Sequence, residues 1–199
     1  MQVLTDNDIA RIPIGAFIEP IADFVVADFA GKTVAPPRHS VDFHTGKIVF
    51  TTGGNDRLAG FRAYESFASH QRIAEQQLVA AWDTQTCALK GVHIGTRLGA
   101  IRTGALGAIA VATLAPASAT TCALIGTGLQ AETQLLGVLA RRPLAQVRVY
   151  SRHKANLEAF VSRMRALTPV GMIACDTAED AAAHADIAIL ATNAGMPVI

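Results

Sequence analysis

The sequence predicts an α/β protein in two parts, an α+β part with an antiparallel sheet and then an α/β part with a parallel sheet. In the first part, short alternating apolar runs are separated by Gly, Asn, Asp and Thr, which is typical of strands joined by hairpins. In the second part, short apolar runs alternate with helical stretches, which is typical of right-handed βαβ units. The change falls near residues 100–118, so we divide the chain into domains 1–117 and 118–199.

Composition limits the classes of function. The chain has 199 residues, of which 51% are hydrophobic and 17% charged, and its formal net charge is +1. This apolar fraction supports a buried core, and the balanced charge excludes a disordered tail or a basic nucleic-acid-binding surface. The three cysteines contain no C-x-x-C and the six histidines no i, i+4 pair, which argues against a disulfide framework or a metal site. The start lacks a signal-peptide pattern, so we expect a cytoplasmic protein.

The elements of the first part follow from residue spacing. Thr5, followed three residues later by Asp8, is typical of a helix start. From 14 to 30, apolar residues recur at near-helical spacing and stop before Gly31, which predicts a second helix. Alternating runs then predict strands at 47–50, 61–67, 78–82 and 89–94. The last two strands flank the clearest hairpin turn.

The second part begins with a stretch that has no charged residue between Arg102 and Glu132, long enough to suggest a transmembrane helix. Pro116, a Ser/Thr-rich stretch and two glycines interrupt it, however. We therefore interpret it as a buried helix over 103–115, a turn and a buried strand over 122–125. Beyond it, we expect helices at 129–140, 153–167 and 178–184 and strands at 147–150, 172–175 and 187–191.

The strand at 122–125 leads into G-T-G-L-Q-A at 126–131, a G-x-G-x-x-A pattern that opens the next helix. Gly126 permits the tight turn, Gly128 lets a pyrophosphate approach the backbone, and the helix N-terminus is aimed at the phosphates. Because the neighbouring strands and helix fall where the pattern requires them, we predict a dinucleotide-binding domain of the Rossmann type. Glycines that serve only a tight turn are the alternative.

The end of the next strand indicates which dinucleotide binds. NAD sites usually have Asp or Glu there to bind the ribose hydroxyls, but this chain has Ser151, Arg152, His153 and Lys154. A carboxylate would repel a 2′-phosphate, whereas Ser151 and Arg152 could bind one. We therefore predict NADP(H) in preference to NAD(H). An ordinary basic first helical turn in solvent is the alternative.

Three segments carry a family resemblance: R-T-G-A at 102–105, I-G-T-G-L-Q-A-E-T-Q at 125–134 and A-T-N at 191–193. Together they resemble the ornithine cyclodeaminase/mu-crystallin family, over the whole chain and most strongly over 88–199. The resemblance implies a homodimer whose sheet domain dimerises and holds the substrate, beside a Rossmann domain that holds NAD(P). It also implies chemistry at the Cα–N bond of small amino or imino acids, such as ornithine cyclodeamination, imine reduction or amino-acid dehydrogenation.

The resemblance assigns roles to residues by position. Basic side chains from three places bind the substrate carboxylate, because a guanidinium offers it paired donors and so fixes Cα over the nicotinamide. In this chain they are Arg38, Arg62 and Arg102, each of which could also be an ordinary surface arginine. The cofactor-binding residues are Gly126, Gly128, Leu129, Gln130, Ser151, Arg152 and Thr192.

Three departures from the family pattern bear on activity. Many members have Lys at the place of Arg62, and lysine can exchange protons in a way that arginine rarely can. The Glu that aids cyclodeaminases falls at Val49, which favours a reductase or a dehydrogenase. The family's catalytic Asp lies beyond Ile199, as do the remaining strands of a sheet that normally has six. We therefore expect a truncated chain, and a catalytically inactive fragment that at most binds nucleotide is the alternative.

Other polar residues have simpler interpretations. Glu65 and Glu75 flank the expected substrate region and could exchange protons, but solvated carboxylates explain them as well. We expect His93 to be packed or paired rather than catalytic, and Trp82 to lie in the core or a dimer interface. A purely structural, crystallin-like role is a third class, for which no residue argues.

Overall fold

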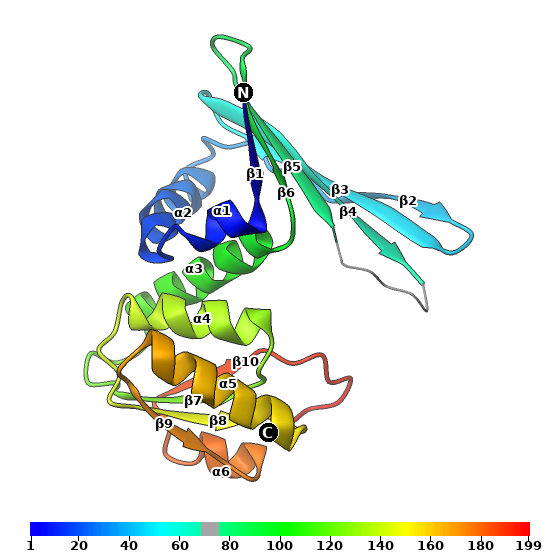
Figure 1. Cartoon of the computed structure of the whole chain (residues 1–199). Helices are drawn as coiled ribbons and strands as arrows, with labels where there is room; N and C mark the ends of the chain where they lie inside the picture. Colours follow the sequence, from blue (N-terminus) through cyan, green and yellow to red (C-terminus); the bar gives the residue numbers. More distant parts are fainter. Residues whose placement is uncertain (69–75) are drawn as a thin grey trace. The chain divides into compact units, whose positions relative to one another are not determined.

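The computed structural model describes residues 1–68 and 76–199, which form two compact units, each built around one sheet (Figure 1). Unit 1 comprises Met1–Pro13 and Pro20–Gly99, and unit 2 comprises Ile14–Glu19 and Ala100–Ile199. The helices α2 (Gly15–Phe29) and α3 (Arg97–Leu114) contribute residues to both units.

Unit 1 contains a six-stranded sheet with the order β1-β6-β5-β4-β3-β2. Strands β2 to β6 pair antiparallel, which the alternating runs predict for β3 to β6. Two strands, β1 and β2, have no counterpart in the sequence analysis, and β1 lies parallel to β6, which makes the sheet mixed. The strands are Gln2–Thr5 (β1), His39–Phe43 (β2), Gly46–Gly54 (β3), Leu58–Phe67 (β4), Gln77–Asp83 (β5) and Leu89–Ile94 (β6).

The first two helices begin close to where residue spacing predicts. At the start of α1 (Asp6–Ala10), the backbone N–H and the hydroxyl of Thr5 both donate to the carboxylate of Asp8, at 2.9 and 2.7 Å. This confirms the expected helix start. The second helix, α2, agrees with the predicted range 14–30 to within a residue at each end.

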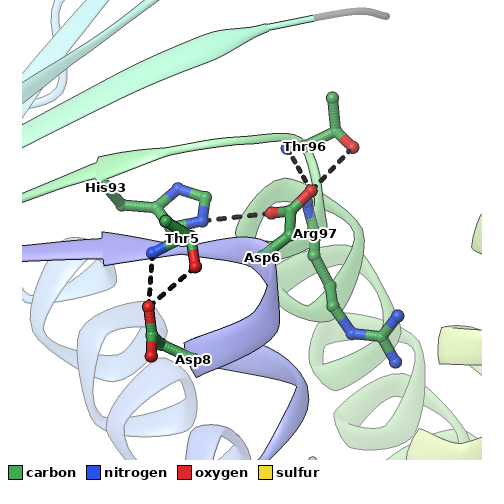
Figure 2. A network of polar contacts seen from close by, with 6 residues as sticks. All are labelled: Thr5, Asp6, Asp8, His93, Thr96 and Arg97. Carbon is green, nitrogen blue, oxygen red and sulfur yellow. Dashed lines mark hydrogen bonds and ion pairs between the residues drawn. The ribbon is translucent and has the colours of Figure 1, made fainter.

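Helix α3 begins at Arg97, six residues before the predicted start at 103, because a distant carboxylate satisfies its first backbone groups (Figure 2). The Asp6 side chain accepts hydrogen bonds from the backbone N–H groups of Thr96, at 3.0 Å, and of Arg97, at 2.9 Å. The Nε2 atom of His93 lies 3.2 Å from the same carboxylate. A carboxylate stabilises a helix N-terminus because the first N–H groups have no partner within the helix.

Unit 2 contains a parallel sheet with the order β10-β7-β8-β9, which confirms the predicted alternation of strands and helices. Its strands are Thr121–Ile125 (β7), Gln146–Tyr150 (β8), Gly171–Ala174 (β9) and Ile187–Leu190 (β10). Its further helices are Leu129–Leu139 (α4), Lys154–Leu167 (α5) and Ala178–Ala182 (α6).

The helices of unit 2 cover both faces of this sheet. Successive side chains of a strand point to opposite faces. Cys122 and Leu124 of β7 therefore pack into the larger core cluster with α4 and α5, whereas Ile125 packs against α6. Figure 1 shows α4 and α5 on one side of the four strands and α6 on the other.

Helix α3 packs against α4 at backbone distance. A Cβ atom on Gly104 would collide with the carbonyl oxygen of Thr133, and one on Gly137 would collide with that of Gly104. Within 1–68 and 76–199, α3 is the one helix long and apolar enough to cross a membrane. Five residues of α3 are buried: Ala100, Ile101, Gly104, Ala105 and Ala108. Four of them are glycine or alanine, and such small residues let two helices pack closely. The side of α3 that carries Gly104 is therefore packed inside unit 2, whereas most residues of the helix are not buried.

Candidate functional site

The glycine turn of unit 2 has the geometry of a phosphate-binding loop. Gly126 follows β7 with φ +118°, and a Cβ there would collide with the carbonyl oxygen of Ala191. Gly128 precedes α4, and a Cβ on it would meet nothing within 4 Å. The space beside Gly128 is therefore open, and the first N–H groups of the helix, those of Leu129 and Gln130, have no acceptor within it. This arrangement fits the pyrophosphate of a dinucleotide.

The carboxyl ends of the neighbouring strands bring the other predicted cofactor residues to this turn. Thr127 donates a hydrogen bond from its hydroxyl to the Ser151 hydroxyl, which follows β8, at 3.2 Å. Arg152 is exposed beside it. On the other side, a Cβ on Gly126 would lie 3.5 Å from the backbone nitrogen of Thr192, which follows β10. Ligands of open parallel sheets bind at this edge.

Arg62 lies on β4 in unit 1 and is half-buried. Its guanidinium carbon is 4.4 Å from the centre of the Tyr64 ring, a cation–π contact. Within the described residues, its Nε atom is buried without a hydrogen-bond partner and no acidic side chain pairs with it. By contrast, Arg163 contacts Glu132 at 3.2 Å. Arg62 therefore carries a positive charge that nothing in the described part of unit 1 neutralises.

The structure places the other two arginines differently. His39 pairs with Phe50, so Arg38 lies one residue beyond the paired part of β2, level with Thr51. Thr51 in turn pairs with Arg62, so Arg38 and Arg62 are at the same level of one sheet. Arg102 is exposed on α3 and belongs to unit 2.

The face of the sheet distinguishes the remaining candidates. Val49 is 3% exposed and pairs with Tyr64, so it lies on the same face as Arg62. Glu65 lies on the opposite face, so it is not beside Arg62. Its carboxylate accepts a hydrogen bond from the Phe67 N–H at 2.8 Å.

His93 is 4% exposed and contacts Asp6, which confirms a paired rather than a free imidazole. Burial acts to raise the pKa of Asp6, but the hydrogen bonds from Arg97 and Thr96, together with His93, outweigh burial and lower it.

Trp82 stacks on Phe61 with ring centres 5.8 Å apart. Burial raises the pKa of the Cys122 thiol to about 12, so it remains protonated and structural. Among the residues that the structure describes, no group of three or more His, Cys, Asp and Glu could hold a metal ion. Glu75 and His70 lie outside the described residues.

Comparison with known proteins identifies the family. A model of the ornithine cyclodeaminase/mu-crystallin family matches residues 8–199. The chain belongs to this family. It is 29% identical to a Delta(1)-pyrroline-2-carboxylate reductase of Bacillus cereus, over 100% of this chain and 63% of that protein. It is 27% identical to the ketimine reductase mu-crystallin of Rattus norvegicus, over 94% of this chain and 56% of that protein.

Comparison with a solved structure confirms the fold. The Delta(1)-pyrroline-2-carboxylate reductase of Thermococcus litoralis, in complex with NADH and L-proline, aligns with a TM-score of 0.90 and 25% identity. The alignment covers 100% of this chain and 64% of that one. The chain thus spans less than two thirds of the length of these three relatives.

Three residues of the candidate site were not predicted from the sequence: Thr127, Tyr64 and Gln77. Thr127 is the variable residue between two glycines, where no side chain is required by the pattern. Tyr64 and Gln77 pair across β4 and β5 on the face that carries Arg62. Alternation of side chains along β4 could have placed Tyr64 beside Arg62, but the partner on β5 depends on strand register.

Proposed function

We propose that the chain belongs to an NADP-dependent enzyme that acts at the Cα–N bond of a small amino or imino acid. The observation that carries the proposal is the half-buried guanidinium of Arg62, which has no acidic partner among the described residues. Burying a charge without a partner is costly, so an anion beyond the described residues completes the site. A substrate carboxylate matches the paired donors of a guanidinium, and Arg38 and Arg102 are its proposed further partners.

Reduction or dehydrogenation fits this chain better than cyclodeamination. Val49 occupies the place of the cyclodeaminase Glu, and it is a buried side chain on the same face as Arg62 that cannot transfer a proton. NADPH, when bound, supplies a hydride from nicotinamide C4 to the substrate Cα. The arginines bind the substrate carboxylate and so hold the substrate Cα in position for hydride transfer.

The preference for NADP rests on the end of β8. Ser151 and Arg152 stand where NAD-binding proteins have an acid, and a 2′-phosphate needs hydrogen-bond donors there. Titration with NADPH and NADH, followed by nicotinamide fluorescence, tests this. NADPH should bind at least about tenfold more tightly, and Arg152→Ala should remove that preference while Arg57→Ala, a surface control, retains it. Preferred binding of NADH that Arg152→Ala does not change contradicts the proposal.

The substrate assignment is tested by catalysis. We expect the protein to reduce cyclic imine carboxylates with NADPH, and Arg62→Gln to lower kcat/KM by at least about tenfold because charge-assisted hydrogen bonds are lost. Affinity for NADPH should be unchanged in this variant. If Arg62→Gln reduces the imine as well as the original protein, Arg62 does not bind the carboxylate.

A second copy of the chain is the proposed partner. The sheet face opposite Arg62 exposes five apolar side chains, one or more on each of four strands: Val3, Val41, Phe43, Leu78 and Ile94. Monomeric proteins rarely leave a contiguous apolar surface in water. The stacked pair of Phe61 and Trp82 lies on the same face, which therefore suits a homodimer in which one sheet packs on another.

A further inference from the structure

Gln77 shares the site of Arg62. It begins β5 directly opposite Tyr64, whose ring contacts the Arg62 guanidinium. Its backbone is held in place, because its carbonyl accepts a hydrogen bond from the Gly95 N–H at 2.9 Å. Since alternate residues share a sheet face, the side chains of Gln77, Tyr64 and Arg62 all lie on one side of the sheet.

The ends of the Gln77 and Arg62 side chains both lie next to Gly99. A Cβ built on Gly99 would lie 3.3 Å from Oε1 of Gln77 and 3.6 Å from Nη1 of Arg62. The guanidinium and the carboxamide therefore both border the space that a side chain at position 99 would occupy, and in the described residues no hydrogen bond joins them to each other. The first turn of α3, which carries Gly99, is held by the Asp6 carboxylate (Figure 2). All of these groups belong to unit 1.

The two groups have complementary chemistry. A guanidinium only donates hydrogen bonds, whereas a carboxamide also offers an accepting oxygen. An amino acid or a protonated imino acid presents a carboxylate, which accepts, beside a nitrogen, which donates. Arg62 can therefore hold the carboxylate but cannot recognise the nitrogen, and the oxygen of Gln77 can.

We propose that Gln77 is a specificity-determining residue that accepts a hydrogen bond from the substrate nitrogen while Arg62 binds the carboxylate. This inference rests on the proposed function. This role explains why Gln77 and Arg62 both end next to Gly99, because a larger residue at position 99 would fill the space that the substrate nitrogen needs. It also predicts that the protein distinguishes nitrogen acids from oxygen acids of the same shape.

Calorimetric titration with two flat ring acids tests this role. Pyrrole-2-carboxylate has a ring N–H beside the carboxylate, and furan-2-carboxylate has a ring oxygen in its place. With NADPH present, the original protein should bind the pyrrole acid about tenfold more tightly, the value of one well-placed hydrogen bond. Gln77→Leu should remove this preference, whereas Arg62→Gln should weaken both acids by a similar factor. Gln85→Leu makes the same chemical change in an exposed turn and should change neither affinity.

The outcomes separate the two proposals. If Gln77→Leu keeps the preference for the pyrrole acid, or if the original protein shows none, Gln77 does not recognise nitrogen and this inference is wrong, although Arg62 can still bind carboxylates. If the original protein binds neither acid, the proposed substrate class is wrong and the inference falls with it. An unchanged affinity for NADPH and an unchanged melting temperature establish that Gln77→Leu is folded.

Discussion

The missing side chain of Gly99 affects two properties of the protein. It lowers the stability of helix α3, and it leaves room for the end of the Gln77 side chain. Alanine is about 1 kcal/mol more favourable than glycine in a helix, and a Cβ at this position would meet only the flexible ends of Gln77 and Arg62. We therefore expect Gly99→Ala to raise the free energy of unfolding by about 0.5–1 kcal/mol. The same Cβ displaces the Gln77 carboxamide, so the affinity for pyrrole-2-carboxylate should fall. Urea denaturation and calorimetry measure the two effects, and a loss of stability with unchanged affinity would contradict this account.

The place of Arg62 in the sequence predicts that it binds the substrate carboxylate, but it does not predict which residues surround it. The sequence predicts a strand at 61–67 and hence which side chains share a face with Arg62, but not what lies opposite. Pairing of Tyr64 with Gln77 depends on strand register, which alternation along a single strand does not fix. The proximity of Gly99 depends on the packing of α3 on that sheet, for which a single sequence carries no periodic signal.

Among the elements, α3 depends on a residue ninety positions earlier in the chain. The pKa of Asp6 is lowered in the folded state, so its ionised form stabilises the fold above the unfolded pKa near 3.8, and this contribution disappears as the pH falls through the folded value. We expect Asp6→Asn to cost about 1–2 kcal/mol near pH 7, because hydrogen bonds to a charged acceptor are lost. The difference from the original protein should shrink below about pH 4.

Denaturant titrations at several pH values measure this effect. Asp56→Asn, at an exposed turn, is the matched control and should follow the original protein throughout. A constant difference between Asp6→Asn and the original protein from neutral to acidic pH would mean that the carboxylate charge does not stabilise the start of α3.

Helices α3 and α4 are in backbone contact, and this contact can be tested by substitution. A Cβ on Gly104 would collide with the Thr133 carbonyl oxygen, which is rigid backbone, whereas one on Gly107 would meet only the end of the Gln134 side chain. Gly104→Ala should therefore destabilise the protein by about 1–3 kcal/mol through overpacking. Gly107→Ala, the same change one turn later, should be neutral or stabilising. Equal melting temperatures for the two variants would contradict backbone contact between the helices.

Elements with strong local signals are those that the sequence predicts. The parallel strands of unit 2 are short apolar runs beside helices, and each falls within a residue or two of its predicted bounds. By contrast, β1 has four residues and the side chains of the edge strand β2 are all exposed, so neither shows an alternation long enough to recognise. The early start of α3 is missed because its stabilising carboxylate comes from Asp6.

On the scale of the whole molecule, the two faces of the unit 1 sheet differ in character. One carries Arg62, Gln77 and the buried His93, and the other carries the exposed apolar set that includes Leu78 and Phe43. Alternation along the predicted strands indicates two distinct faces, but only the exposed fractions show that the described residues leave the second one uncovered. Association through that face would remove this surface from water, which would stabilise the dimer by about 25 cal/mol for each Å² of apolar surface buried.

The exposed apolar face of the unit 1 sheet determines how we expect the protein to associate. We expect the protein to sediment as a dimer and Leu78→Lys to shift it to a monomer, because a charge placed in an apolar interface must be desolvated without a partner. Phe43→Lys, at the edge strand of the same face, should act in the same direction. Leu114→Lys is the matched control, since this leucine is 81% exposed at the end of α3 and lies outside unit 1. Sedimentation equilibrium with circular dichroism distinguishes dissociation from unfolding. A dimer that withstands both lysines on the sheet face must use another surface, and the apolar set would then need a different cover.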